Sequence, residues 1–206
     1  MGYYEEQILP RGINWVMSGK IFRRLRAQYL QQVSGEILEV GFGSGLNLPY
    51  YSSRVDKVYA LDPSRVAHRL AAQRISVAPF PVETVDLREG IIDLPDHSVD
   101  QVVTTWTLCT IPDALSALKE MQRVLKPHGR YHFLEHGRSP EKRVSQWQDI
   151  WNPLQKRFAG GCHVNRPIRQ LIIESGFRIE SLNNFYMAGP KIFTYMYQGS
   201  AVLDRG

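Results

Sequence analysis

The residues with the clearest chemical potential lie around one glycine-rich turn. Glu39 precedes the turn Gly41-Phe42-Gly43-Ser44-Gly45, and Asp62 ends the next apolar run along the chain. Short apolar runs of this kind suit buried parallel strands. In an open sheet with helices on its faces, ligands bind beyond the C-terminal ends of such strands, where the strand order reverses. The spacing therefore predicts a small-molecule site with two carboxylates and a close approach to the backbone.

The glycine turn departs from both common phosphate-binding loops. A dinucleotide fingerprint needs its third glycine one position later, where Leu46 stands, and a phosphate-gripping loop needs Lys followed by Ser or Thr. The Glu39 charge also opposes a pyrophosphate, since two unit charges about 4 Å apart interact by roughly 4 kcal/mol at an effective dielectric of about 20. A carboxylate at the position of Asp62 accepts hydrogen bonds from ribose hydroxyls. A ribose-containing cation without phosphate meets these conditions, and S-adenosylmethionine is such a ligand.

Each of these features also has a purely structural explanation. A single G-x-G-x-G occurs in many turns, Glu39 could cap a neighbouring amide, and Asp62 before Pro63 could form only a turn. The order of the three features on two consecutive strand ends favours the cofactor.

Strands and helices alternate along the chain, which predicts a parallel sheet with helices on both faces. The predicted strands cover residues 36–41, 57–62, 79–85, 99–106, 130–135, 177–187 and 191–199. The predicted helices cover residues 13–33, 44–51, 64–75, 113–125 and 167–175. The connection at residues 188–190 is too short for a crossover, so the last two strands should pair antiparallel. The expected fold is α/β and Rossmann-like, with a mostly parallel seven-stranded sheet and one antiparallel strand near the C-terminus.

The 206 residues predict a single domain in three parts. Residues 1–35 would form an N-terminal helical lid or membrane-facing segment, residues 36–137 the cofactor-binding core, and residues 138–206 the substrate-side helices and terminal hairpin. The first part carries a basic cluster opposite an apolar stripe: Lys20, Arg23, Arg24 and Arg26. Such a cluster can contact an anionic membrane, cover the cofactor or be a solvated helix face.

Composition narrows the function classes. No apolar run reaches the roughly 18 residues that cross a bilayer, and the N-terminus MGYYEEQILP lacks a secretory pattern. The net charge of +5 is mildly basic, and no nucleic-acid partner is expected. Cys109 and Cys162 are too few for a disulfide framework, which fits a cytoplasmic location. No histidine stands at a zinc-binding spacing from them, so no metal is expected. The oligomeric state stays open.

Four ordered motifs resemble those of the class I S-adenosylmethionine-dependent methyltransferases, over residues 36–137. They are ILEVGFGSG, VYALDPS, VDQVVTTWTLCTI and LKEMQRVLKPHGRYHFLEHG, with His128 standing where the family usually has glycine. Within this superfamily the chain is most similar to the methyltransferase-like alkyl thiol methyltransferases. That similarity extends through LCTI, FLEHG, residues 147–151, and Gly160-Gly161-Cys162 followed by Arg166. The phosphatidylethanolamine and quinone-pathway methyltransferases share the same core.

The resemblance implies which residues hold S-adenosylmethionine. The methionine part would lie among Glu39 and the glycine turn, the ribose at Asp62 and Pro63, and the adenine at residues 86–88. The end of the strand over residues 99–106 would lie beside cofactor and substrate. The expected cofactor-binding residues are Glu39, Gly41, Phe42, Gly43, Gly45, Asn47, Asp62, Pro63, Leu87, Arg88, Thr105 and Trp106.

Methyl transfer to a thiol needs alignment with the sulfonium, exclusion of water and the thiolate form of the acceptor. A thiol with a pKa of about 8.5 is already ionised to a few per cent at neutral pH, so a base helps without being required. His136 is the candidate catalytic base because it ends a strand on the binding edge, and a histidine bonded to a backbone carbonyl is the alternative. The expected substrate-side residues are Trp106, His136, Trp147, Cys162, His163 and Arg166.

Two of these expectations have structural alternatives. Cys162 could be a small buried residue, because methyl transfer needs no covalent enzyme intermediate. Trp147 and Trp151, four residues apart on one helix face, could wall an apolar pocket or pack in the core.

The sequence thus predicts a cytoplasmic S-adenosylmethionine-dependent methyltransferase, with a peripheral membrane location as the alternative. Its acceptor would be a small apolar molecule, with S-methylation of a thiol favoured. N-methylation of a phospholipid amine such as phosphatidylethanolamine, or C-methylation of a quinone precursor, is the alternative reaction. A catalytically silent cofactor-binding partner protein is a third hypothesis. Glu39 and the missing third glycine argue against a nicotinamide oxidoreductase.

Overall fold

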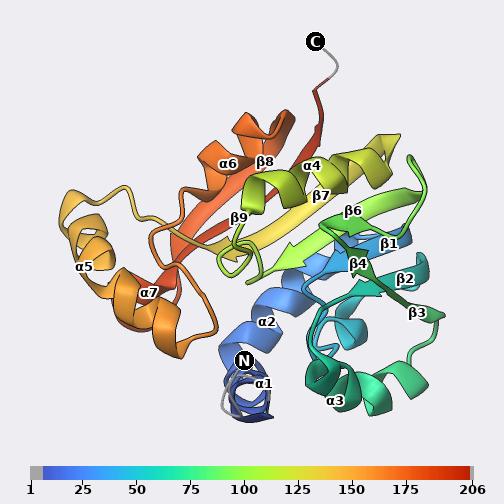
Figure 1. The fold of residues 1–206 in the computed structure, drawn as a ribbon, viewed down its shortest axis with the longest axis horizontal. Helices are drawn as coiled ribbons and strands as arrows, with labels where there is room; N and C mark the ends of the chain where they lie inside the picture. Colours follow the sequence, from blue (N-terminus) through green and yellow to red (C-terminus); the bar gives the residue numbers. More distant parts are fainter. Residues whose placement is uncertain (1–6, 205–206) are drawn as a thin grey trace.

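A seven-stranded sheet lies at the centre of the computed structural model, which describes residues 7–204 (Figure 1). Its strand order is β3-β2-β1-β6-β7-β9-β8. The strands are β1 (Gly35–Val40), β2 (Val55–Leu61), β3 (Val82–Val85), β6 (Val99–Thr105), β7 (Leu125–His136), β8 (Phe177–Tyr186) and β9 (Tyr195–Leu203). A separate hairpin consists of β4 (Leu87–Arg88) and β5 (Ile91–Ile92). The first six residues of the predicted N-terminal segment and the last two residues of the chain lie outside the described residues.

The sheet is parallel except for β9, which pairs antiparallel with both β7 and β8. This confirms the predicted mostly parallel sheet with one reversed strand near the C-terminus. The last strand begins at Tyr195 and not at residue 191, because the short helix α7 (Lys191–Thr194) comes first. Pro190 precedes this helix at its N-cap, where no backbone N–H is needed for an intrahelical bond.

Helices cover both faces of the sheet, as predicted. The longer helices are α1 (Leu9–Met17), α2 (Lys20–Tyr29), α3 (Arg65–Ser76), α4 (Ala114–Val124), α5 (Lys142–Phe158) and α6 (Ile168–Glu174). Side chains of α4 and α6 share one core with Leu38 of β1, and side chains of α2 and α3 share a second core with Ile37. Adjacent strand residues point to opposite faces, so the two cores lie on opposite sides of the sheet.

The N-terminal segment differs from the single helix predicted over residues 13–33. It forms α1 and α2, separated at Ser18 and Gly19, and then a 3₁₀ turn at Leu30–Gln32. Gly19, at the N-cap of α2, has an extended backbone (ψ 156°) that ends the helical run. The prediction of a solvated arginine face is also wrong in one position, because Arg26 is buried with 3% of its surface exposed.

The helix predicted over residues 44–51 is likewise wrong. That segment contains only a 3₁₀ turn, Leu48–Tyr50. Gly43 and Gly45 adopt positive φ angles of 57° and 72°, which an α-helix cannot accommodate. The glycine turn, residues 41–45, therefore stays open at the end of β1.

The predicted start of one strand, β7, is wrong. The predicted helix stop is right, since α4 ends at Val124, but β7 begins at Leu125 and not at residue 130. Its pairing with β6 passes from Val99–Leu125 directly to Gln101–Arg130, so residues 126–129 bulge from the ladder.

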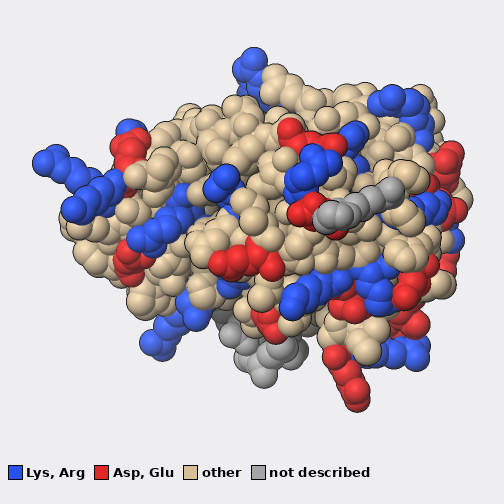
Figure 2. All heavy atoms as spheres, turned by 90° about the horizontal axis from the view of Figure 1, so that it is seen from above, with Lys and Arg blue, Asp and Glu red and all other residues tan. Residues whose placement is uncertain are grey.

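The distribution of surface charge and the length of the helices are relevant to nucleic-acid and membrane partners. On the face shown in Figure 2, Lys and Arg side chains are interspersed with Asp and Glu. Every helix within residues 7–204 is too short or too polar to cross a bilayer.

Candidate active site

Asp62 and the glycine turn form one hydrogen-bonded unit beyond β1 and β2. The Gly43 N–H donates to Asp62 Oδ2 at 2.8 Å, and the Ser64 N–H donates to Oδ1 at 2.8 Å. Gly41 has a φ of 75°, and a Cβ built there would lie 2.1 Å from Thr107 Oγ1, so no other residue fits. Asp62 therefore shapes the turn, as the structural alternative required, because each of its carboxylate oxygens accepts a backbone N–H. Ribose binding by Asp62 and Pro63 stays a prediction.

Glu39 is a buried carboxyl, with 1% of its surface exposed. Its Oε1 accepts a hydrogen bond from Asn47 Nδ2 at 2.9 Å, and its Oε2 accepts one from the Tyr51 hydroxyl at 2.7 Å. Burial raises the pKa of Glu39 to about 8, although both hydrogen bonds and the nearby Arg26 act in the opposite direction. A cationic ligand beside Glu39 would favour its ionised form, which is what the sequence predicted for this residue.

Arg26 joins α2 to this carboxyl. Its Nε donates to Asn47 Oδ1 at 2.8 Å, its Nη1 donates to the Met17 carbonyl at 2.7 Å, and its guanidinium lies 4.9 Å from the ring centre of Trp106. Burial lowers the pKa of Arg26 to about 10, with Glu39 opposing that shift. Sequence reasoning missed this role, but Arg26 follows Phe22 by four residues and so shares the stripe of α2 that faces the protein.

The end of β6 lies under α2. Thr105 Oγ1 accepts a hydrogen bond from Asn47 Nδ2 at 3.0 Å, which places it in the same network as Glu39. The Trp106 ring packs edge-on against Phe22 at 5.2 Å between ring centres. Within residues 7–204, the buried Nε1 of Trp106 has no hydrogen-bond partner. A buried donor without a partner is costly, so a polar group of a ligand would be stabilised there.

The predicted adenine contacts lie on the small hairpin. Leu87 is exposed, and Arg88 pairs with Asp93 at 3.0 Å. Among the described residues, no hydrogen bond or ion pair joins this hairpin to the glycine turn. Adenine binding by Leu87 and Arg88 stays a prediction.

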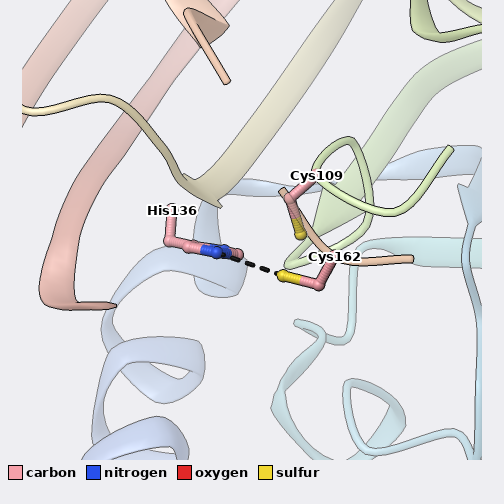
Figure 3. Close-up of side chains that lie close together, drawn as sticks. All are labelled: Cys109, His136 and Cys162. Atoms are coloured by element: carbon pink, nitrogen blue, oxygen red, sulfur yellow. Dashed lines mark hydrogen bonds between the residues drawn. The ribbon is translucent and has the colours of Figure 1, made fainter. Parts of the chain in front are cut away.

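A second group of reactive side chains, which we call the thiol–imidazole cluster, consists of Cys109, His136 and Cys162 (Figure 3). Cys162 Sγ lies 3.2 Å from His136 Nε2, and the two sulfurs and the imidazole nitrogen all lie within 4.8 Å of one another. His136 ends β7, as predicted, whereas Cys109 follows β6 and Cys162 follows α5. All three residues are buried.

The members of this cluster shift one another's pKa values. Hydrogen bonds from Cys109 and His136 lower the pKa of Cys162 to about 4, against the opposing effect of burial. Burial disfavours the charged form of His136, but its contact with Cys162 raises its pKa overall. The cluster also corrects the sequence argument that no histidine suits the two cysteines, because the fold brings together residues that are 26 or more positions apart.

Thr107 connects the glycine turn to the cluster. Its side chain fills the space beside Gly41, and its N–H donates to Glu135 Oε2 at 2.8 Å. Glu135 precedes His136 and is completely buried, and burial raises its pKa to about 7. Sequence reasoning did not single out Glu135 or Thr107, although both stand beside residues it did select.

Arg166 and His163 have backbone contacts next to the cluster. Arg166 Nη1 donates to the carbonyls of Leu108 at 2.6 Å and Ile111 at 2.5 Å, so this side chain holds the loop that carries Cys109. The His163 N–H donates to the Cys109 carbonyl at 2.8 Å. Substrate contact by Arg166 and His163 stays a prediction.

Trp147 and Trp151 are exposed by 55% and 41%, so the alternative of core packing is wrong for both. They belong to a row of exposed apolar side chains on α5, which we call the α5 row: Trp147, Ile150, Trp151, Leu154 and Phe158. Val144 and Gln148 of the same helix are buried, and Gln148 Nε2 donates to the Gly137 carbonyl at 3.0 Å. An enclosed pocket wall is therefore not their role in this conformation.

The sequence of this chain is similar to those of several known methyltransferases. Residues 38–133 match a family described as a methyltransferase domain. Thiol S-methyltransferase TMT1B of Rattus norvegicus is 32% identical over 143 residues, covering 66% of this chain and 58% of that protein. Thiol S-methyltransferase TMT1A of Homo sapiens is 26% identical over 181 residues, covering 81% and 74%. Phosphatidylethanolamine N-methyltransferase of Cereibacter sphaeroides is 35% identical over 120 residues, covering 55% and 57%. The chain thus spans little more than half the length of the TMT1B relative.

Solved structures share the fold at low sequence identity. An S-adenosylmethionine-dependent methyltransferase from Aquifex aeolicus has a TM-score of 0.61 at 20% identity, covering 93% of this chain and 97% of that one. The [4+2]-cyclase SpnF has a TM-score of 0.65 at 17% identity, covering 88% and 79%. Because a cyclase shares this architecture, the fold alone does not define the reaction.

The strand order and the open glycine turn beyond β1 and β2 are those of a Rossmann-like domain, a fold whose ligands bind at the switch point of the sheet. Over residues 38–133 the chain is similar to methyltransferase domains, for which the sequence predicts S-adenosylmethionine as the cofactor. The residues present fit that cofactor, since Glu39 is a buried carboxyl suited to a cation and Trp106 Nε1 is a buried donor without a protein partner.

Proposed function

We propose that this chain transfers the methyl group of S-adenosylmethionine to the sulfur of a small apolar thiol. The observation that supports this most directly is that the glycine turn and the thiol–imidazole cluster lie at the ends of neighbouring strands, linked by Thr107 and Glu135. The relatives that are thiol S-methyltransferases support the same acceptor. Donor and acceptor would meet between the turn and His136.

The side chains would divide the work of the reaction. S-adenosylmethionine supplies a methyl group on a sulfonium, and the bond from that carbon to the sulfonium breaks as the acceptor sulfur forms its new bond. Glu39 would hold the cationic part of the cofactor, Asp62 its ribose, and Trp106 under α2 would exclude water. The thiolate form of the acceptor would be favoured beside the His136 imidazole, whose contact with Cys162 raises its pKa, and the proton of the acceptor thiol would pass to solvent.

A phospholipid amine is the second candidate acceptor. The relative from Cereibacter sphaeroides is a phosphatidylethanolamine N-methyltransferase, and the α5 row would suit an acceptor that resides in a lipid surface. A thiol is favoured because it ionises near pH 8.5, within reach of an imidazole, whereas an amine must lose its proton at a higher pH.

Thermal unfolding with added ligands tests the cofactor. We expect S-adenosylhomocysteine to raise the unfolding temperature, because a ligand at about 100 times its Kd stabilises the folded state by about 2.7 kcal/mol. NADH at the same concentration should leave the temperature unchanged. Stabilisation by NADH alone would contradict the proposal.

Transfer of a labelled methyl group tests the acceptor. The protein is incubated with labelled S-adenosylmethionine and a panel of alkyl and aryl thiols, ethanolamine lipids in vesicles and demethylated quinones. We expect label in the thiols, with His136→Ala reducing turnover by on the order of 100-fold while S-adenosylhomocysteine still binds. His97→Asn, at an exposed histidine, is the matched control and should act like the unchanged protein. Labelling of the lipid amine and of no thiol would reverse the proposed order.

A further inference from the structure

The thiol–imidazole cluster contains side chains that commonly bind metal ions. It contains both cysteines of the chain and one histidine, delivered by three separate parts of the fold. Figure 3 shows the two sulfurs and the imidazole directed toward a common point. Two thiolates and one imidazole are donors that zinc prefers, and catalytic zinc sites use three protein donors with the fourth position open.

The distances fit such a site after a small contraction. Donor atoms around a tetrahedral zinc lie roughly 3.5 Å apart, since each is about 2.0–2.3 Å from the metal. Cys162 Sγ and His136 Nε2 are already 3.2 Å apart, and no donor pair exceeds 4.8 Å. A contraction of at most about 1.3 Å in the longest pair would complete three ligand positions.

The local charges are compatible with a divalent cation. Two thiolates and a neutral imidazole cancel the +2 charge of zinc, so the loaded site carries no net charge in its buried position. Glu135 on one side adds a carboxyl, and Arg166 on another adds a guanidinium that holds the backbone of Leu108. The anchors of the cluster are also fixed, since the His163 N–H bonds to the Cys109 carbonyl and the Cys162 N–H bonds to the Ala159 carbonyl.

From this geometry we infer that Cys109, His136 and Cys162 bind one zinc ion, and that the open fourth position takes the sulfur of the acceptor thiol. The identity of the fourth ligand rests on the proposed function, whereas the binding of the metal by the three side chains does not. On loading, the cluster releases two protons to solvent, one from Cys109 and one from the Cys162–His136 pair. The acceptor then releases its own proton to solvent as its sulfur bonds to zinc, so the metal takes over from His136 the role of favouring the thiolate.

The following step balances without another reactant. The zinc-held thiolate donates an electron pair to the methyl carbon, and the carbon–sulfonium bond breaks with its pair returning to the cofactor sulfur. The products are a neutral thioether and S-adenosylhomocysteine. A thioether is a much weaker zinc ligand than a thiolate, so the methylated product would leave the fourth position.

Metal binding is tested first, without reference to activity. The chain is stripped with a chelator, dialysed and titrated with zinc against a competing chromogenic chelator, and bound zinc is measured by mass spectrometry. We expect one zinc per chain, and loading with Co²⁺ in its place should produce the absorption of thiolate-to-cobalt charge transfer. Less than a tenth of an equivalent of zinc, with no such absorption, would overturn the inference.

Single substitutions locate the ligands. Cys109→Ser and Cys162→Ser should each weaken zinc binding by at least about 100-fold, since outer-shell partners of a metal alone contribute 10–100-fold. His97→Asn, at an exposed histidine outside the cluster, is the matched control and should keep full affinity. Binding of S-adenosylhomocysteine by each variant verifies that it is folded. Unchanged zinc affinity in both folded cysteine variants would place the metal elsewhere and overturn the assignment.

Activity then separates this inference from the proposed function. With zinc restored, we expect thiol methylation to rise on the order of tenfold above that of the metal-free chain. Equal thiol methylation with and without zinc would refute the metal's role and leave the proposed function standing. One bound zinc with the expected ligands, but methylation of a lipid amine only, would refute the thiol acceptor and leave the metal site standing.

Discussion

Glu39 is a carboxyl that the fold keeps away from water. Asn47 and Tyr51 donate hydrogen bonds to it, but burial outweighs them and raises its pKa from 4.5 to about 8. Between these pH values the folded chain retains a proton that the unfolded chain has released. The stability due to this group is therefore complete below about pH 4.5 and is lost as the pH rises through about 8.

Replacing Glu39 by Gln should separate stability from binding. Glutamine at this position cannot ionise. At pH 8 we therefore expect the Glu39→Gln variant to have a free energy of unfolding on the order of a few kcal/mol higher than that of the wild-type protein, whereas near pH 4 the two values should differ little. The same variant should bind S-adenosylhomocysteine at least roughly tenfold more weakly, because the ammonium group of this ligand loses its carboxylate partner. Urea denaturation across this pH range and calorimetric titration measure the two effects. A variant less stable than the unchanged protein at pH 8 would contradict the buried-charge argument.

Local patterns predicted part of this site and missed the rest. The glycine turn, Glu39 and Asp62 were visible in the sequence because each depends on its immediate neighbours at a strand end. The burial of Arg26 was not, because charged side chains on a helix usually face water and only packing of α2 on the sheet reverses this. Cys109 and Cys162 were likewise discounted on spacing, since only the fold brings them to His136.

At the scale of elements, α2 is held over the cofactor side of the sheet by one buried arginine. Arg26 bonds to Asn47, which in turn bonds to Glu39 and Thr105. The same side chain bonds to the Met17 carbonyl at the end of α1 and lies on the Trp106 ring. The position of the two N-terminal helices is therefore coupled to the orientation of the Asn47 amide.

Arg26→Ala should loosen this cover without unfolding the sheet. We expect faster amide hydrogen exchange in α1 and α2, and weaker binding of S-adenosylhomocysteine by roughly tenfold, since a hydrogen bond to a charged group contributes about 1.5–3 kcal/mol. Arg23→Ala, on the exposed face of the same helix, is the matched control. Exchange in β1 and β6 should stay slow in both variants. Equal exchange and affinity in the two variants would show that Arg26 does not hold α2.

The elements themselves were predicted with uneven success for physical reasons. α4 and the β6 strand follow clear periodicity and were placed within a residue or two. The break between α1 and α2 was missed because Gly19 is compatible with a weak helix, and only the extended backbone observed there ends it. The helix predicted after the turn was wrong because glycines at positive φ continue through residue 45.

At the scale of the whole molecule, one tyrosine ties the N-terminal helices to the C-terminal strands. The Tyr29 hydroxyl donates to the Gly199 carbonyl of β9 and accepts from the Phe133 N–H of β7 at 3.1 Å. Phe133 and Gly199 are partners in the β7–β9 ladder, so the hydroxyl stands between two paired strands. Its burial raises the pKa of Tyr29 far above the ordinary range for tyrosine.

Tyr29→Phe should therefore destabilise the entire fold. Removal of the hydroxyl leaves a buried N–H and a buried carbonyl without this partner, which costs about 1–3 kcal/mol. We expect that loss in the free energy of unfolding measured in urea, with an unchanged dependence on urea concentration. Tyr50→Phe is a suitable control, since no hydrogen bond of the Tyr50 hydroxyl is found within residues 7–204. A loss confined to α2 by hydrogen exchange, with global stability intact, would contradict the bridging role.

The reversed strand β9 has a consequence for biosynthesis. Although it is the last strand of the described chain, it lies inside the sheet, with β7 on one side and β8 on the other. During translation β8 leaves the ribosome first and has no edge to join until β9 emerges, so the nascent chain carries an incomplete sheet until residues 195–203 are released. A premature stop codon before residue 195 would thus leave both β7 and β8 without their pairing partner β9. A chaperone that shields exposed strand edges would matter most while β8 has emerged and β9 has not.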